Sequence, residues 1–180
     1  MKRFLLGIWE VLEVSLIAVV TVFLIRTFLV QPFLVSGASM EPNFSDGDYL
    51  LIDEITPRFR ELSRGEVIVF RYPLDRSLFF IKRIIGMPGE RIVSQNGMIK
   101  VYKNGEEIAI DESYLPRDLK SNDNFDIRLN KDQYFVLGDN RYRSFDSRNW
   151  GPVSRKDIVG LTRIRILPLK EFGIVESPVY

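Results

Sequence analysis

An apolar run near the N-terminus, Val11 to Val30, limits the possible architectures more than any other part of the chain. As a helix rising about 1.5 Å per residue, a run of this length spans about 30 Å, the thickness of the hydrocarbon core of a bilayer. Its two charged residues, Glu13 and Arg26, lie toward its ends, where long side chains reach the headgroups. We therefore predict one transmembrane helix over about residues 11–30, within a membrane anchor of residues 1–31.

The charges on either side of this run predict its orientation. Lys2 and Arg3 precede it, and no basic residue occurs between Arg26 and Arg58. Several acidic residues occupy that interval: Glu41, Asp46, Asp48, Asp53 and Glu54. Because cytoplasmic flanks carry the excess of basic residues, we expect a single-pass protein of the cytoplasmic membrane with a cytoplasmic N-terminus and residues 32–180 extracytoplasmic.

Two other interpretations of the run are open. A buried core helix can be equally apolar, but Val14 to Ile25 has no polar face beyond Ser15 and Thr21. A cleavable signal peptide would use the small residues of Ser36-Gly37-Ala38 as its cleavage site. The length of the apolar region and the acidic Glu10 argue against cleavage.

The absence of histidine and cysteine from the 180 residues narrows the chemistry. It excludes disulfides, thiolate nucleophiles, imidazole bases and the usual zinc sites, so any catalysis uses other groups. The net charge of +1 provides no electrostatic attraction to nucleic acid, which we do not expect as a partner.

Beyond Pro32, which we expect to end the helix, apolar residues alternate with polar ones between turn signals. Asn96-Gly97 and Asn104-Gly105 are hairpin signals that predict a meander, and residues 111–130 are predicted to be a surface excursion. The body is thus predicted to be a mainly β domain of antiparallel, sheet-like or barrel-like architecture without helices. Its expected strands are Tyr49–Asp53, Glu66–Tyr72, Phe79–Ile85, Arg91–Ser94, Met98–Tyr102, Glu106–Ile110, Gln133–Leu137 and Ile158–Ile166.

Lys82 is a candidate catalytic base within one of these strands. Phe80, Lys82 and Ile84 share one face of a strand, which places the amine between two large apolar side chains. Lowering a lysine pKa from about 10.4 to near 7 requires about 4 to 5 kcal/mol, which burial can supply. The alternative is an edge lysine whose ammonium reaches water, and periodicity alone favours that alternative.

Ser39 is the matching candidate nucleophile, in the segment Val35 to Pro42. The small residues before it would let another backbone approach closely. A serine hydroxyl needs a base, and without histidine a neutral lysine amine can take that role. The alternative is a serine and glycine turn that leaves the membrane.

A polar stretch, Gly138 to Gly151, follows the expected strand Gln133–Leu137. Its acidic, amide and basic side chains predict a hydrogen-bonded network that fixes a loop at the end of a sheet, or else a solvated loop. Asp139 and Asp146 show no recognised metal-ligand spacing, so we expect neither a metal nor a cofactor. The candidate network residues are Asp139, Asn140, Arg141, Asp146 and Arg148.

Taken together, these segments resemble type I signal peptidases, also called leader peptidases, through most of the chain and in the family's order. Ser39–Pro42 resembles the nucleophile box and Arg64–Phe70 the following strand box. Lys82–Glu90 resembles the lysine box and Gly138–Gly151 the last box. Four boxes behind an apolar N-terminal segment form a specific signature.

The resemblance implies a membrane-anchored serine endopeptidase that removes signal peptides with a Ser39–Lys82 dyad. Neutral Lys82 would take the proton of Ser39 during acylation and would then activate the water that hydrolyses the acyl-enzyme. The resemblance also implies that the Ser39 backbone N–H donates to the oxyanion, that the Ser144 hydroxyl orients Lys82, and that Asp146 and Arg148 form a supporting ion pair.

By the same resemblance, the substrates are secreted preproteins with small residues at positions −1 and −3 before the cut. The other implied partners are the lipid bilayer and, as a candidate, the secretion translocon. The residues that resemble the family's pockets and peptide-docking edge are Phe33, Val35, Phe79, Phe80 and Ile81, the last three through backbone pairing with the substrate.

Three positions depart from the family pattern. Gly37 stands where some members have a serine that adds an oxyanion hydroxyl, Asn43 where threonine is usual, and Tyr142-Arg143 where an Asp-Asn pair is usual. Two alternative functions remain. Self-cleaving Ser-Lys repressors carry a DNA-binding module, which has no counterpart in this sequence. A non-catalytic, membrane-tethered peptide-binding β module would not need both Ser39 and Lys82.

Overall fold

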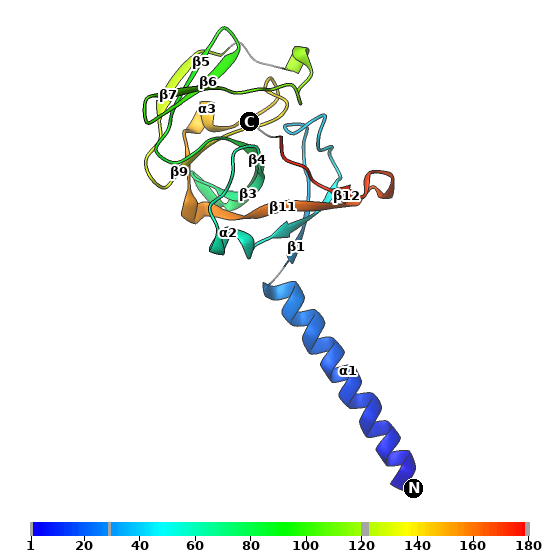
Figure 1. Cartoon of the computed structure of the whole chain (residues 1–180). Helices are drawn as coiled ribbons and strands as arrows, with labels where there is room; N and C mark the ends of the chain where they lie inside the picture. The colour runs from blue at the N-terminus through cyan, green and yellow to red at the C-terminus, as the bar shows by residue number, and fades with distance from the viewer. Residues whose placement is uncertain (1, 29, 120–122, 179–180) are drawn as a thin grey trace.

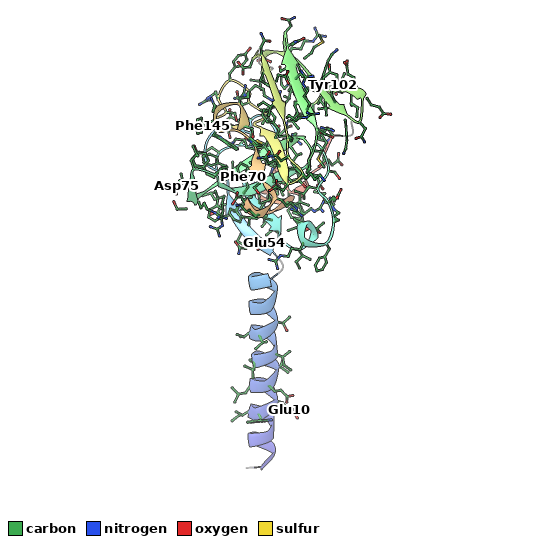
Figure 2. All side chains as sticks on the ribbon, turned by 90° about the vertical axis from the view of Figure 1, so that its left-hand side faces the viewer. Glu10, Glu54, Phe70, Asp75, Tyr102 and Phe145 are labelled. Carbon is green, nitrogen blue, oxygen red and sulfur yellow. The ribbon has the colours of Figure 1, made fainter. Side chains whose placement is uncertain are left out.

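The computed structural model describes residues 2–28, 30–119 and 123–178, with the side chains of residues 7–21, 31–119 and 123–178. The N-terminal helix α1 (Lys2–Phe28) projects from the end of a β-rich body that holds β1, and the smaller of two sheets lies at the opposite end (Figure 1). Tyr102 lies at that far end, whereas Glu54 lies close to α1 (Figure 2).

The predicted transmembrane span of residues 11–30 falls within α1 as far as Phe28. Its last part, residues 22–30, has side chains outside those that the structure describes. Within the described part of the chain, no helix combines the length and the apolar character that a membrane crossing requires.

The larger sheet has the strand order β1-β2-β11-β3-β4-β9-β10, with β12 added to β11. All of these pairings are antiparallel. Its central strand β3 is buried from Val67 to Phe70 and carries the core that contains Ile68 and Phe70. The strands are β1 (Val30–Leu34), β2 (Tyr49–Asp53), β3 (Val67–Tyr72), β4 (Asp75–Gly86), β9 (Gln133–Leu137), β10 (Val153–Ser154), β11 (Ile158–Leu167) and β12 (Gly173–Ile174).

The smaller sheet has the order β7-β6-β5-β8 and packs on the larger one through Ile92, Ile85 and Phe135. Asn96-Gly97 and Asn104-Gly105 connect its hairpins with positive φ at all four residues, the backbone that two-residue hairpin turns require. Its strands are β5 (Arg91–Gln95), β6 (Met98–Lys103), β7 (Glu106–Ala109) and β8 (Phe125–Arg128).

The prediction of a mainly β body with a meander is confirmed, and four details of it are wrong. Pro32 lies inside β1 instead of ending the helix, and its missing N–H is tolerated because β1 is an edge strand. The predicted excursion 111–130 contains β8, which pairs with β5. β10 and β12 were not predicted, because each has two residues and is too short to show the alternation that is typical of a strand. The body also contains short helices: α2 (Thr56–Phe59), α3 (Ser147–Trp150), η1 (Arg117–Leu119), η2 (Arg155–Asp157) and η3 (Leu169–Glu171).

Candidate active site

A cleft of about 290 Å³ opens where two strand segments approach each other. One wall is formed by residues 33–39, from the end of β1 into the following loop, and the other by residues 79–82 of β4. Arg143 and Phe145, from the loop after β9, complete it. Phe145 lies at the surface of the body, whereas Phe70 lies in its interior (Figure 2).

The side chains of Ser39 and Lys82 meet in this cleft. Lys82 Nζ donates a hydrogen bond to Ser39 Oγ at 2.8 Å and another to the carbonyl oxygen of Ile81, also at 2.8 Å. The two residues are 43 positions apart in the sequence, so their contact depends on the packing of β4 beside the loop after β1. The arrangement brings an alcohol and an amine within proton-transfer distance.

Lys82 is 4% exposed. Its Nζ lies 5.6 Å from the centre of the Phe80 ring, as expected for residues on one face of a strand. Desolvation lowers the pKa of Lys82 to about 8, although the charges of Asp146 and Asp139 act to raise it. About a tenth of the molecules would therefore carry a neutral amine at pH 7, and about half at pH 8.

The loop that carries Ser39 is fixed on both sides. Gly37 N donates to Asp46 Oδ1 at 2.7 Å, and Gly37 has φ of +90°, which favours glycine. On the far side, Met40 is fully buried in the core. The carbonyl oxygen of Ser39 accepts a hydrogen bond from Asn140 N at 3.1 Å, which connects this loop to the loop after β9.

Ser144 lies close to the carbonyl oxygen of Ser39, beside Gly138, without bonding to Ser39 or Lys82. Its Oγ is buried and has no hydrogen-bond partner in the described part of the chain, so the predicted bond that would orient Lys82 is not formed in this structure. The two acceptors of Lys82 Nζ are Ser39 Oγ and the Ile81 carbonyl oxygen. The orienting role of Ser144 and the oxyanion role of the Ser39 N–H stay predictions.

Asp146 and Arg148 form an ion pair that folds the loop after β9. Arg148 Nε lies 2.8 Å from Asp146 Oδ1, and the carboxylate is fully buried. Asp146 also accepts from Gly138 N at 3.0 Å and caps the N-terminus of α3. Arg148 donates to the carbonyl oxygen of Arg141 at 2.6 Å. The pair therefore joins both ends of the loop.

Two more of the predicted network residues contact the same loop. Asn140 accepts from Arg143 N through its side-chain oxygen at 3.3 Å. Arg141 donates to the carbonyl oxygen of Gly138 at 3.0 Å and forms a buried ion pair with Glu112 at 2.5 Å. These bonds help to fold the loop after β9, which contributes Arg143 and Phe145 to the cleft.

Asp139, by contrast, pairs with Arg83, which is not among the predicted site residues. Arg83 donates to both of its carboxylate oxygens, at 2.8 and 2.6 Å, and both side chains are buried. Arg83 also bonds the carbonyl oxygen of Gly65, and Asn43 Nδ2 donates to Asp139 at 2.9 Å. One sequence signal was available: an arginine next to Lys82 in an apolar strand faces the opposite side and needs a buried partner.

All five predicted substrate-binding residues line the cleft. The rings of Phe33 and Phe79 are 5.6 Å apart and narrow it from both walls. β4 pairs with β3 along Phe79–Ile81, but its pairing with β9 begins only at Arg83. β1 pairs with β2 alone. In the described structure, each wall therefore presents an unpaired strand edge to the cleft.

A family model described as "Signal peptidase, peptidase S26" matches residues 8–167. The chain belongs to the signal peptidase family. It is therefore a peptidase, a hydrolase of peptide bonds.

"Signal peptidase I P" of Bacillus subtilis subsp. natto is 34% identical over 93% of this chain and 94% of the relative. "Probable signal peptidase I-2" of Synechocystis sp. is 37% identical over 88% of this chain and 72% of the relative. A solved signal peptidase I from Enterococcus faecalis V583 is 27% identical, covers 57% of this chain and 97% of that chain, and has a TM-score of 0.48.

Proposed function

We propose that this signal peptidase family member removes N-terminal signal peptides from secreted preproteins, with Ser39 as the nucleophile and Lys82 as the general base. The observation that carries the proposal is the 2.8 Å contact between Ser39 Oγ and the buried Lys82 Nζ. Relatives that bear the name signal peptidase I match most of the chain and support the substrate class.

In the acylation step, Lys82 takes the proton of Ser39 while Oγ bonds to the carbonyl carbon of the scissile peptide. The tetrahedral intermediate collapses as Lys82 returns the proton to the leaving amine. In the second step, Lys82 takes a proton from the water that attacks the acyl-enzyme, and it returns this proton to Ser39 Oγ as the ester bond breaks and the signal peptide leaves with a free carboxyl group. The backbone N–H of Ser39 would donate a hydrogen bond to the oxyanion in both tetrahedral intermediates. Gly37 has no side-chain hydroxyl that could donate a second one.

The substrate would bind as an extended strand between the open edges of β1 and β4. Backbone hydrogen bonds would hold the peptide, and alternate side chains would point into the walls. The close rings of Phe33 and Phe79, and the buried Val35, leave room for small side chains such as alanine. This geometry supports a preference for small residues at −1 and −3.

We assign α1 the role of a single-pass membrane anchor with a cytoplasmic N-terminus. Its described residues 8–21 are exposed throughout, and the helix leaves the body as an isolated rod (Figure 1). An exposed apolar surface of this size calls for a partner, for which the bilayer is the candidate that the apolar run 11–30 supports. Enzyme and preprotein would then share one membrane, or meet at the translocon, and the cut would occur at high effective concentration.

The test uses the purified full chain in neutral detergent micelles with a preprotein, and the new N-terminus of the product is sequenced. Ser39→Ala, Lys82→Ala and Lys82→Arg should each abolish cleavage, the last because a guanidinium stays protonated. Ser113→Ala and Lys100→Ala, at exposed sites away from the cleft, are the matched controls and should retain full activity. Thermal unfolding verifies that every variant folds. Activity retained by any folded variant of Ser39 or Lys82 would refute the dyad.

A further inference from the structure

Arg143 is the exception in a cleft lined mainly by apolar and small side chains. It is one of the positions at which the chain departs from the family pattern, and its side chain is 69% exposed. Within the described part of the chain, no acidic side chain lines the cleft, and Lys82 is the other basic one. The amine of Lys82 must be neutral to act as a base. Among the cleft residues that the structure describes, Arg143 is therefore the one whose side chain stays charged during the reaction.

The position of Arg143 relative to the dyad follows from the two walls. Residues 33–38 lead up to Ser39, and residues 79–81 lead up to Lys82, so both walls end at the dyad. Arg143 lies beyond that point: its NH1 is 3.8 Å from Oε2 of Glu41, two residues past the nucleophile. Its backbone N donates to the carbonyl oxygen of Asn140, whose own N bonds the Ser39 carbonyl.

The end of the signal peptide would lie in the cleft between the two walls. The first residues of the mature protein must therefore continue past Arg143. The contact between Arg143 and Glu41 is long, and both side chains are solvent-exposed, so it is weak. The guanidinium keeps donors for a planar, bidentate bond with another carboxylate. Glu41 then acts as a competitor for that site.

We propose that Arg143 is a specificity-determining residue that favours preproteins with an acidic side chain at the first or second position after the cut. The inference rests on the proposed function and extends it to the part of the substrate that follows the cut. Because the pair would be exposed to solvent, we expect a two- to fivefold preference for an acidic residue over its amide at low salt. The preference should decline as salt screens the pair.

The experiment compares two soluble peptide substrates that differ only in Asp or Asn at the first position after the cut, and a second pair with Glu or Gln at the next position. The ratio of kcat/KM within each pair is measured in neutral detergent micelles at low and high salt. Arg143→Asn should bring the larger ratio to one, Arg143→Lys should keep part of it, and Glu41→Gln should enlarge it. Arg117→Asn, on the exposed η1, is the matched control and should keep the wild-type ratio.

A wild-type ratio of one for both pairs, or a ratio that survives Arg143→Asn, would overturn the inference. So would an effect of Arg143→Asn that appears only on vesicles with anionic lipid, because it would assign Arg143 to phosphate groups. The dissociation constants of the same peptides are also measured with the Ser39→Ala chain, which should bind them without cleaving them. The ratio of these constants within each pair reports the preference independently of catalysis. If wild type cleaves no peptide, the proposed function fails, and the binding ratio still decides on Arg143.

Discussion

A β-carbon on Gly138 would lie 2.5 Å from the carbonyl oxygen of Ser39 and 2.2 Å from Ser144 Oγ. Real β-carbons do not approach backbone oxygen this closely, so the loop after β9 can touch the loop that carries Ser39 only because residue 138 is glycine. This contact places Asn140 within bonding distance of the Ser39 carbonyl, and it places the buried Asp146 near Lys82.

Gly138→Ala should push the loop that carries Ser39 away from Lys82. We expect cleavage to fall by about 100-fold, as a displacement of about 1 Å at a reacting group can cause, and stability to fall by about 1–3 kcal/mol. Gly173→Ala is the matched control, because a β-carbon there meets no atom within 4 Å. Near-normal kcat in folded Gly138→Ala would contradict the role given to this contact.

The buried pair of Arg83 and Asp139 should dominate the stability of the site. Asp139→Asn removes the carboxylate that accepts two hydrogen bonds from Arg83, and we expect a loss of about 3–5 kcal/mol in the free energy of unfolding by urea. Asp126→Asn breaks a surface pair with Arg91, both about half exposed, and should lower the free energy of unfolding much less, because water screens the pair. Equal losses in the two variants would contradict this assignment.

Arg165 connects the loop that carries Ser39 to residues 168–178, which lie beyond the family match. It donates to the carbonyl oxygen of Asn43 and pairs with Glu171, and its guanidinium lies 5.2 Å from the centre of the Phe44 ring. Arg165→Ala should lower the unfolding free energy by about 1–3 kcal/mol and reduce kcat. Glu171→Gln, at a more exposed partner, should lower it by less than about 1 kcal/mol. Thermal and urea unfolding measure both, and a larger loss in Glu171→Gln would reverse the assignment.

The lowered pKa of Lys82 predicts how stability depends on pH. The folded chain loses this proton near pH 8, whereas the unfolded chain keeps it to about pH 10.5. Between these values the unfolded state binds more protons, so burial of Lys82 makes stability rise with pH across that window. Below pH 8 both states are protonated and the contribution is constant. Urea titrations should show the rise in wild type relative to Lys82→Met, and parallel curves for the two proteins would refute it.

The sequence predicted strands wherever alternation was long enough to be read. Tyr49–Asp53 and Gln133–Leu137 coincide with β2 and β9 to the residue. β1 was missed because it follows the apolar run directly and contains a proline. β8 was missed because its polar residues match those of the loop around it. In both cases the pairing partner, distant in sequence, decides the structure.

The candidate site also contains features that the sequence predicts and features that depend on residues distant in sequence. Residue type and the resemblance predicted that Ser39 and Lys82 act together, and the structure brings their side chains into contact. The polar stretch from residue 138 predicted a hydrogen-bonded network, and the loop after β9 contains one. The strand pattern indicates that Arg83 needs a buried partner, but it does not identify that partner as Asp139, which lies 56 residues away. The absence of a hydrogen bond at Ser144 also depends on packing, which a linear pattern does not contain.

The proposed catalysis requires an uncharged Lys82, and the titration of Lys82 can be observed directly. With lysine labelled at Cε, NMR of the full chain in micelles follows the ionisation of Lys82, and Lys82→Arg assigns its signal. We predict a pKa of about 8, and a kcat/KM for preprotein cleavage that rises about tenfold per pH unit below pH 8 and levels off above it with the same midpoint. A Lys82 that titrates near 10.5 while cleavage is already at its plateau at pH 8 would contradict the role of Lys82 as the general base.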